Sequence, residues 1–146
     1  DHMLGSLARW LRFLGFDTAY PQVLSDKELV EAAKREERIL LTRDRDLAKR
    51  KGISALYIQS TELDKQLEQV ISTFNLRIEE AFSRCSLCNS ILTEVDKGSV
   101  KGRVPEKVYE WQDEFWRCEQ CDKYYWQGTH YKNMEVKLKE LEGKTG

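Results

Sequence analysis

Apolar residues recur at helical spacing in the first part of the chain. In residues 3–14 they return every three or four positions, which predicts an amphipathic helix that ends at Gly15 and carries Leu4, Leu7, Ala8, Leu11 and Leu14. The sequence from Ser25 to Glu28 has the form of a capping box and predicts the start of a second helix. The same spacing over residues 63–74 predicts a third long helix.

Short apolar runs between these helices predict strands. Residues 38–42 form a nearly continuous apolar run, as in a parallel sheet covered on both faces, and residues 55–58 form another. Residues 18–20 predict a shorter strand, and residues 46–51 predict a short helix. This alternation indicates an α/β domain with a parallel sheet in three layers. The first helix has no strand before it, and we expect one ahead of Asp1.

The composition changes near Ser83. All four cysteines and three of the four tryptophans lie in residues 83–146. The sequence therefore predicts an α/β domain over residues 1–82, followed by a small β-rich module with a C-terminal tail over residues 83–146. No linker rich in proline, glycine or serine separates the two, so we expect them to pack together. Residues 134–142 are expected to form a charged helix or tail with a solvated face.

Two Cys-x-x-Cys pairs stand at the spacing of a zinc site. Cys85 and Cys88 form the first pair, and Cys118 and Cys121 form the second. Two such pairs are typical of one tetrahedral Zn²⁺ site, in which each pair supplies two thiolates from a tight turn. Two disulfides are the alternative, and the lack of a secretory pattern favours zinc. Four thiolates leave no open position for a substrate, so we expect a structural zinc ribbon.

Aspartates are predicted to meet at one edge of the parallel sheet. In open α/β sheets, ligands bind beyond the carboxyl ends of the strands. Asp44 and Asp46 directly follow the strand at residues 38–42. Asp26 follows the shorter strand before it, and Asp1 would end the expected first strand. Carboxylates at one edge repel each other, and Mg²⁺ or Mn²⁺ would relieve that repulsion and activate a water for attack on a phosphodiester.

Arginines near these aspartates complete the predicted site. Their guanidinium groups would hold the phosphates of a substrate: Arg9, Arg12, Arg43 and Arg45. Simpler roles stay open for the aspartates. Asp26 alone is typical of a helix cap, and Asp44 and Asp46 alone are typical of solvated loop charges paired with arginines. Asp17 precedes its predicted strand, falls at the opposite edge and is excluded.

The charges of the chain nearly cancel. Its 146 residues include 24 basic and 25 acidic side chains, for a formal net charge of −1. Bulk charge therefore does not attract nucleic acid, and any anion-binding surface is local. No apolar run approaches the ~18–20 residues that a membrane helix needs, so we expect no membrane partner and a cytoplasmic protein.

Aromatic and basic residues gather in the second part of the chain. The aromatic residues are Trp111, Trp116, Tyr124, Tyr125, Trp126 and Tyr131, and the basic ones are Arg117, Lys123 and Lys132. Such rings stack on unpaired bases, or they form the small core of the module and its contact with the first domain. His130 is a candidate zinc ligand, general acid or structural hydrogen-bonding residue, and a contact with substrate is also open. Because four thiolates already complete a zinc site, we do not expect His130 to bind the zinc.

Recognisable motifs lie at residues 1–12, 15–18, 38–44, 115–121 and 125–131. Together they resemble the Mut-seven C-terminal ribonuclease family, and the resemblance spans nearly the whole chain. It implies a PIN-like nuclease domain followed by a zinc ribbon, and hydrolysis of RNA with Mg²⁺ or Mn²⁺ bound at acidic residues. Matched motif by motif, the acidic positions are Asp1, Asp26, Asp44 and Asp46.

The expected function is that of a metal-dependent ribonuclease. Its substrate would be RNA, its structural cofactor Zn²⁺, and its catalytic cofactor Mg²⁺ or Mn²⁺. Two alternatives stay open. One is an RNA-binding module without activity. The other is a subunit of an RNA-processing assembly whose ribbon docks a protein partner, and a homodimer is open as well.

Overall fold

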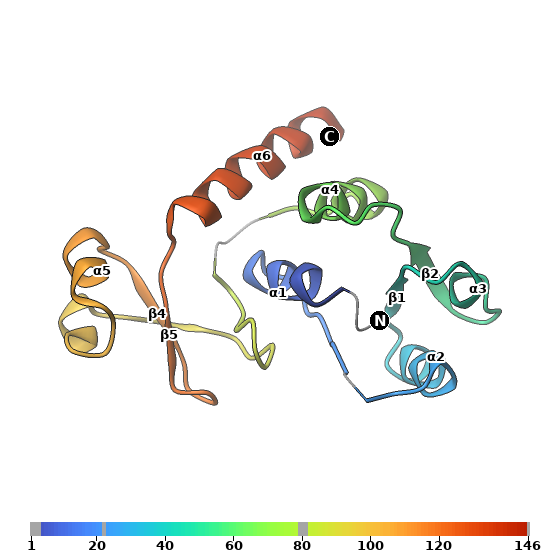
Figure 1. Cartoon of the computed structure of the whole chain (residues 1–146), viewed down its shortest axis with the longest axis horizontal. Coiled ribbons are helices and arrows are strands. Elements are labelled where there is room, and N and C mark those ends of the chain that lie inside the picture. The colour runs from blue at the N-terminus through green and yellow to red at the C-terminus, as the bar shows by residue number, and fades with distance from the viewer. Residues whose placement is uncertain (1–3, 22, 79–81, 146) are drawn as a thin grey trace.

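The computed structural model describes residues 4–21, 23–78 and 82–145, and their side chains as far as Leu141. The first part of the chain contains α1 (Gly5–Phe13), α2 (Asp26–Arg35), β1 (Ile39–Thr42), α3 (Arg45–Ala48), β2 (Ser54–Tyr57) and α4 (Leu63–Phe74). The second part contains β3 (Thr93–Val95), the 3-10 helix η2 (Lys97–Val100), α5 (Glu106–Trp111), β4 (Phe115–Cys118), β5 (Lys123–Tyr125) and α6 (Thr129–Thr145). Figure 1 shows their arrangement.

Helices pack against both faces of a small parallel sheet. β1 and β2 pair in parallel, with Leu40 opposite Ala55 and Leu41 opposite Leu56. Leu40 and Ala55 pack with side chains of α2 and α3. Leu41 and Leu56 pack instead against a larger core built by α1, α4 and α6. Successive side chains of a strand point to opposite faces, which is why one short run serves two cores. The wider, PIN-like three-layer sheet stays a prediction.

The predicted helices form close to their expected bounds. The capping box is confirmed, because Ser25 Oγ accepts from the Glu28 N–H and Glu28 Oε1 accepts from the Ser25 N–H, each at 3.2 Å. α4 spans the predicted range and ends at Asn75, which has the left-handed φ of 50° that suits asparagine. Local sequence signals thus determine where these helices start and stop.

Residues 18–20 form no strand, so this prediction is wrong. The Thr18 N–H donates to Asn89 Oδ1 at 3.1 Å, and the Thr18 backbone oxygen accepts from Arg12 Nε at 2.8 Å. Both backbone groups are therefore bonded to side chains and not to a neighbouring strand. Asp26 follows an irregular segment as a result, although it still begins α2.

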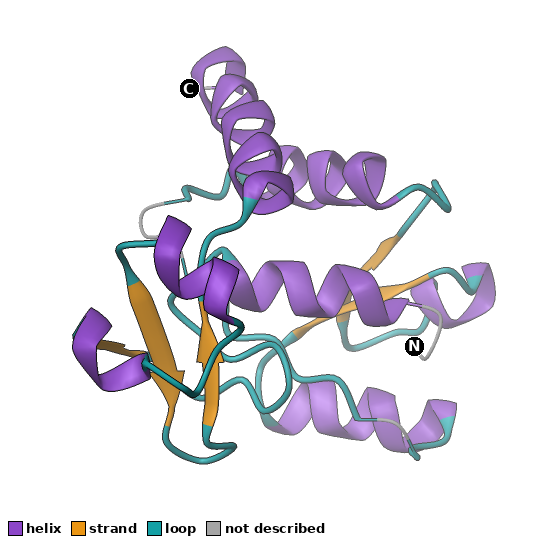
Figure 2. Cartoon of the chain, turned by 60° about the vertical axis from the view of Figure 1, so that its left-hand side comes forward, coloured by secondary structure: helices purple, strands orange, loops and turns teal. Residues whose placement is uncertain are grey.

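The second part of the chain contains a three-stranded antiparallel sheet in the order β3-β4-β5. Val95 lies opposite Phe115, and Arg117 lies opposite Tyr124. Figure 2 shows this sheet apart from the parallel pair, with η2 and α5 in the connection between β3 and β4. The predicted β-rich module is confirmed as a sheet, while the domain boundary near Ser83 stays a prediction.

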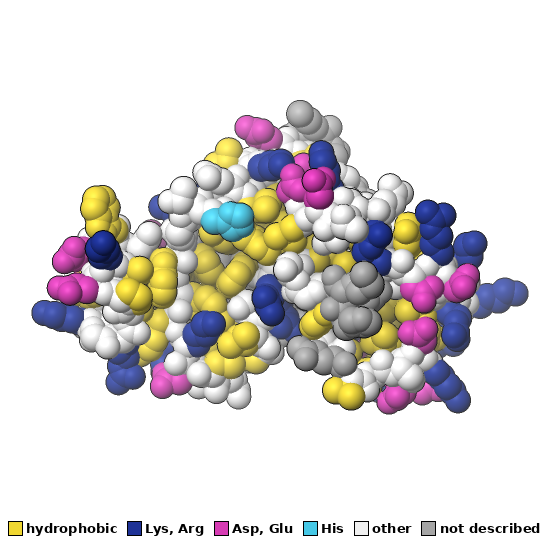
Figure 3. Space-filling view, in the orientation of Figure 1, with side chains coloured by type: hydrophobic (Ala, Val, Ile, Leu, Met, Phe, Trp, Pro, Cys, Tyr) yellow, Lys and Arg dark blue, Asp and Glu magenta, His cyan; other side chains and the backbone are white. Residues whose placement is uncertain are grey.

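Aromatic side chains of α1 join the two parts. Phe13 lies edge-on to Phe82 with ring centroids 4.8 Å apart, and Trp10 stacks on Tyr131 at 5.7 Å. Phe82 and Tyr131 belong to the core of the second part, together with Tyr125. Figure 3 shows hydrophobic side chains gathered over the region between α1 and the antiparallel sheet. The expectation that the two parts pack together is confirmed.

The C-terminal helix α6 returns to the first part of the chain and packs along α4 (Figure 1). Met134 and Leu138 are buried in the larger core, and Lys137 Nζ donates to Asp64 Oδ2 at 2.6 Å. The predicted helix is confirmed, but the expectation that its surface is only solvated is wrong. No helix within the described ranges is long and apolar enough to cross a membrane.

Candidate functional site

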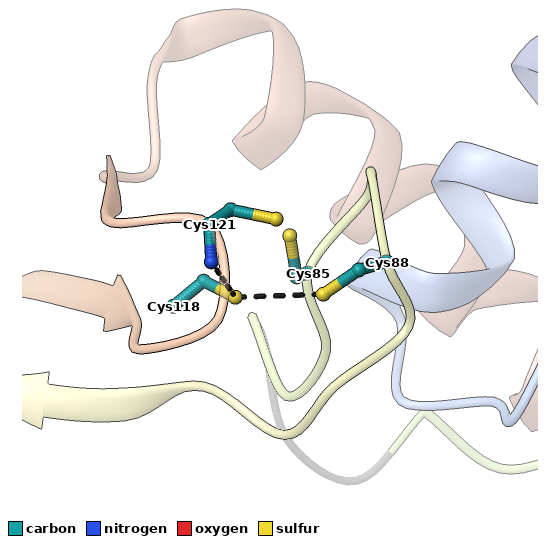
Figure 4. Close-up of side chains that lie close together, drawn as sticks. All are labelled: Cys85, Cys88, Cys118 and Cys121. Atoms are coloured by element: carbon teal, nitrogen blue, oxygen red, sulfur yellow. Dashed lines mark hydrogen bonds between the residues drawn. The ribbon is translucent and has the colours of Figure 1, made fainter.

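Four cysteines from two loops come together in the second part of the chain (Figure 4). Their sulfur atoms all lie within 4.8 Å of one another, so they could hold one metal ion such as zinc. Cys85 and Cys118 are buried, whereas Cys88 and Cys121 are exposed. All four are free cysteines, so no disulfide links the two pairs. The geometry therefore favours a metal site over the alternative of two disulfides.

Each Cys-x-x-Cys turn is closed in the same way. The residue after the second cysteine has a positive φ, 71° at Asn89 and 51° at Asp122. Asparagine and aspartate tolerate this left-handed conformation better than most residues. In each turn a backbone N–H points at the first sulfur: Leu87 N lies 3.4 Å from Cys85 Sγ, and Cys121 N lies 3.4 Å from Cys118 Sγ. These contacts fix the position of the two buried sulfurs within their turns.

Three of the four cysteines have a pKa that departs from the ordinary value of a thiol. Burial acts to raise the pKa of Cys88, but hydrogen bonds with the side chain and backbone of Ser90 outweigh it and lower the pKa to about 6. Its hydrogen bond with Cys88, followed by burial, raises the pKa of Cys121 to about 12. Burial also raises the pKa of Cys118. A thiolate at one cysteine therefore disfavours ionisation of the neighbouring cysteines, because like charges repel. A divalent cation bound among the sulfurs would remove this repulsion and let all four ionise.

The Tyr125 hydroxyl and the Arg12 guanidinium form hydrogen bonds at the turn that carries Cys85. Tyr125 Oη lies 3.0 Å from Cys85 Sγ and 3.2 Å from Ser86 Oγ. Arg12 Nη1 donates to the Ser86 backbone oxygen at 2.6 Å. Burial lowers the pKa of Arg12, in spite of the nearby sulfurs that act to raise it. A hydrogen bond thus links the turn between Cys85 and Cys88 to α1.

Asp44 connects the end of β1 to α3. Its carboxylate caps α3, because Oδ1 accepts from the backbone N–H of Asp46 at 2.9 Å and of Leu47 at 3.1 Å. Its own N–H donates to Thr42 Oγ1 at 2.9 Å. These contacts hold the exposed carboxylate in one orientation just beyond the carboxyl end of β1. Asp46 lies in the first turn of α3 and is exposed as well.

Asp26 is the first residue of α2 and is exposed. The cap of this helix is Ser25, so the simpler interpretation of Asp26 as the helix cap is wrong. Asp1, the remaining predicted carboxylate, lies outside the described residues. Across the described ranges, the cysteines are the only group of three or more Cys, His, Asp or Glu side chains close enough to share one metal ion. A carboxylate metal site stays a prediction.

Asp26, Asp44 and Asp46 lie at element ends that share one side of the molecule. In Figure 2 the N-terminal ends of α1 and α2, and the end of β1 that leads into α3, all point to the right-hand side of the molecule. This is the carboxyl edge of the parallel pair, where α/β sheets bind ligands.

The predicted arginines differ in their surroundings. Arg12 is buried and donates to the backbone oxygens of Thr18 and Ser86. Arg43 Nη1 donates to the backbone oxygens of Ile58 and Gln59, at 2.7 and 2.9 Å. These contacts tie both guanidinium groups to the backbone. Arg9 and Arg45 are exposed, and the Arg45 guanidinium lies 5.0 Å from the centre of the Tyr57 ring.

The aromatic residues of the second part mostly serve the core. Tyr125 and Tyr131 are buried, and Trp116 stacks on Phe82 with centroids 5.4 Å apart. Trp111 is the contrast, with 80% of its surface exposed. His130 is exposed and lies edge-on to Trp10 at 5.3 Å. Its predicted contact with substrate stays a prediction.

The aromatic seam on α1 was missed by sequence reasoning. Trp10 and Phe13 are spaced three residues apart, on a different face from the Leu7–Leu11–Leu14 stripe. A helix with two apolar faces has two surfaces to bury. The spacing of Trp10 and Phe13 beside the leucines was the sequence signal for the second face.

Comparisons with known proteins give a single result. No curated protein matches the chain. No solved structure matches it either. The family described as Mut7-C RNAse domain matches residues 1–138, which is nearly the whole chain and includes both the parallel strands and the four cysteines. This chain therefore belongs to the Mut7-C RNAse domain family.

Proposed function

We propose that this protein is a divalent-metal-dependent ribonuclease. The observation that carries the proposal is the family match over residues 1–138. Two structural facts support it: Asp44 and Asp46 lie just beyond the carboxyl end of β1, and α2, which begins at Asp26, has its N-terminal end on the same side of the molecule. RNA is then the substrate, and the phosphodiester bond is the group that reacts.

The donor set suits a hard cation. Oxygen ligands are what Mg²⁺ and Mn²⁺ prefer, and Asp26, Asp44 and Asp46 are exposed to the water that such ions keep as ligands. In the proposed site, Asp1, Asp26, Asp44 and Asp46 hold the ion. A bound Mg²⁺ or Mn²⁺ would supply a polarised phosphate and a water of lowered pKa. Because both α3 amides donate to Asp44 Oδ1, this carboxylate is pre-oriented while Oδ2 is left for the cation.

Exposed arginines are the proposed phosphate contacts. Arg45 lies next to Asp44 and Asp46 and is supported by the face of Tyr57. Arg9 is exposed on α1. A guanidinium binds phosphate oxygens in a bidentate manner, so these two positions suit the RNA backbone. Arg12 and Arg43 act instead through the backbone oxygens that they already contact, and so position the neighbouring segments.

The cysteine cluster is the proposed binding site of one structural Zn²⁺. Tetrahedral zinc is bound by four thiolates in many small β-rich modules. With Cys85, Cys88, Cys118 and Cys121 as its ligands, the ion has no open position for substrate. Its role is then to hold together the two loops that carry the cysteines.

A cleavage assay on RNA tests the catalytic proposal. Cleavage is expected with Mg²⁺ or Mn²⁺ and not with EDTA. Asp44→Asn keeps the cap of α3, since asparagine caps helices as well as aspartate does, and removes only the charge. We expect it to lower the cleavage rate by at least ~100-fold while the protein still binds RNA. Asp113→Asn, an exposed aspartate of the second part, is the matched control and should cleave normally.

Two outcomes would contradict the proposal. Cleavage that continues unchanged in EDTA would exclude a metal-dependent reaction. RNA binding with no cleavage under any metal condition would favour an RNA-binding module without activity.

A further inference from the structure

The first Cys-x-x-Cys turn forms hydrogen bonds with the first part of the chain. Asn89, the residue directly after Cys88, uses both ends of its side-chain amide. Its Oδ1 accepts from the Thr18 N–H at 3.1 Å, and its Nδ2 donates to Asp17 Oδ1 at 2.6 Å. Figure 4 shows the loop that carries Cys85 and Cys88 beside the faint blue ribbon of the first part of the chain. One side chain thus joins the cysteine turn to two successive residues after α1.

These contacts continue to the start of the parallel sheet. Arg38, the residue directly before β1, donates from Nη1 and Nη2 to the two carboxylate oxygens of Asp17, at 3.2 and 3.3 Å. Arg12 adds a second connection, because its guanidinium donates to the backbone oxygens of Ser86 and Thr18. The first turn is therefore connected by hydrogen bonds to α1, to the segment after α1 and to the residue before β1.

The second Cys-x-x-Cys turn has no such connection among the described residues. The residue equivalent to Asn89 is Asp122, which has a positive φ of 51° and accepts from Arg117 Nε at 3.1 Å. Arg117 lies on β4 directly before Cys118, so this contact stays within the second part of the chain. Two turns with the same backbone feature therefore use the same position for different contacts, and the first turn is the one bonded to the first part.

The position of the Asn89 amide depends on the geometry of its turn. Asn89 has a left-handed φ of 71°, and its N–H donates to the Cys85 backbone oxygen at 2.9 Å. A left-handed φ is uncommon outside glycine and persists where the surroundings impose it. A metal ion bound by Cys85 and Cys88 would fix both ends of this turn, because each pair supplies two ligands to one ion. Metal binding and the contacts of Asn89 thus favour the same conformation of the turn.

We propose that metal occupancy at the cysteines controls the order of residues 16–18, and that the side chain of Asn89 couples the two. With the metal bound, the turn is fixed and its amide holds Thr18 and Asp17. With the metal lost, the turn relaxes from its left-handed geometry and releases both contacts. The coupling is reciprocal, so the contacts of Asn89 also raise the affinity for the metal. This inference rests on the proposed zinc site and not on the proposed nuclease activity.

Hydrogen exchange with and without zinc tests the proposal. The zinc content of the full chain is measured before and after treatment with a chelator, and exchange of the backbone amides is followed by NMR. Zinc removal is expected to speed exchange of the Thr18 amide at least ~tenfold. The amide of Leu67, a fully buried residue in the middle of α4, is the internal reference and should keep its exchange rate.

The variant Asn89→Gly separates the side chain from the turn. Glycine adopts a left-handed φ readily, so this variant keeps the backbone of the turn and loses only the amide. The Thr18 amide is then expected to exchange fast whether or not zinc is bound. Zinc affinity, measured by competition with a chromophoric chelator, is expected to fall several-fold. Asp122→Gly is the matched control in the second turn, and in this variant the Thr18 amide should still respond to zinc.

Three outcomes would overturn the coupling while leaving the zinc site intact. They are unchanged exchange at Thr18 after zinc removal, equal acceleration at Thr18 and Leu67, and a response of Thr18 to zinc that persists in Asn89→Gly. The second outcome would indicate general unfolding, and the third would assign the coupling to Arg12. A purified chain that holds no zinc and takes up none when zinc is added would remove the zinc site itself, and this inference with it.

Discussion

Arg12 Nη1 donates a 2.6 Å hydrogen bond to the backbone oxygen of Ser86, the residue directly after Cys85. Its Nε donates to the backbone oxygen of Thr18. One buried guanidinium on α1 therefore satisfies acceptors in two segments that lie far apart in the sequence. The turn that carries Cys85 and the irregular segment after α1 are thus both bonded to Arg12.

Replacing Arg12 is expected to destabilise the whole chain. In Arg12→Ala the part-buried oxygen of Thr18 and the buried oxygen of Ser86 lose their donor, and each unsatisfied group costs about 1–3 kcal/mol. We expect the free energy of unfolding in urea to fall by about 2–5 kcal/mol. Arg9→Ala, an exposed position on the same helix, is the control and should change it by less than ~0.5 kcal/mol. Equal effects of the two variants would contradict this role of Arg12.

Metal removal is expected to loosen the second part of the chain. Metal analysis of the purified protein should find about one zinc per chain, since four thiolates form one site. A strong chelator should lower the midpoint of thermal unfolding, and Cys118→Ser should lose the zinc. Ser99→Ala, an exposed residue of η2, is a control that should keep it. Purified protein without zinc, in which all four thiols react freely, would contradict the metal site.

The helix α6 is expected to stabilise the first part of the chain. Leu138 is fully buried against side chains of α1 and α4, so Leu138→Ala leaves a cavity and should cost about 2–5 kcal/mol in urea unfolding. Val136 lies on the same helix with 58% of its surface exposed. Val136→Ala is therefore the matched control, with little change expected. A similar small effect of both variants would show that α6 does not contribute to the core.

Asp17 gives a pH dependence of stability. Hydrogen bonds from Asn89 and then Arg38 lower the pKa of this carboxyl. A lowered folded-state pKa means that the contribution is present above the ordinary aspartate pKa and is lost as the pH falls through the folded-state value. Asp17→Asn should lower the free energy of unfolding at pH 7 by less than about 1 kcal/mol, because the side chain is half exposed. The difference from the unmodified protein should shrink below pH ~4, and a difference that grows on acidification would contradict this assignment.

Arg45 is expected to affect RNA binding more than stability. Arg45→Gln removes a charge next to the proposed carboxylate rim, so RNA affinity should fall several-fold at low salt and its salt dependence should become shallower. Arg103→Gln, an exposed position in the second part of the chain, is the control. Fluorescence anisotropy with a labelled RNA across a salt series measures both quantities. Identical salt slopes for the two variants would remove Arg45 from the interface.

Local signals in the sequence were sufficient for much of the fold. The capping box at Ser25 and the apolar spacing of residues 63–74 each involve contacts within one helix, and both elements form as predicted. The two Cys-x-x-Cys pairs predicted a common site because a short motif dictates a tight turn wherever it occurs. The parallel pairing of β1 with β2 followed from their apolar runs and the short connection through α3.

The errors arose where distant partners decide the outcome. Thr18 bonds to Asn89, which lies 71 residues away, and nothing in residues 18–20 reveals this competition with a strand. In α6, Met134 and Leu138 are buried, but most of their neighbours in the sequence are charged or polar. The sequence of this helix therefore resembles that of a helix exposed to solvent on all sides. The aspartates remain a hypothesis for the same reason, since a metal site depends on several segments at once.

Because α1 contributes to both cores, we expect the two parts of the chain to fold and unfold together. Leu7 and Leu11 belong to one core, Phe13 packs against the other, and Trp10 packs against both. A fragment that starts at residue 83 would lose the rings of Phe13 and Phe82 and leave Tyr131 uncovered. Heating should accordingly melt the protein in one sharp step, and a protease that severs α1 should release neither part as an intact piece.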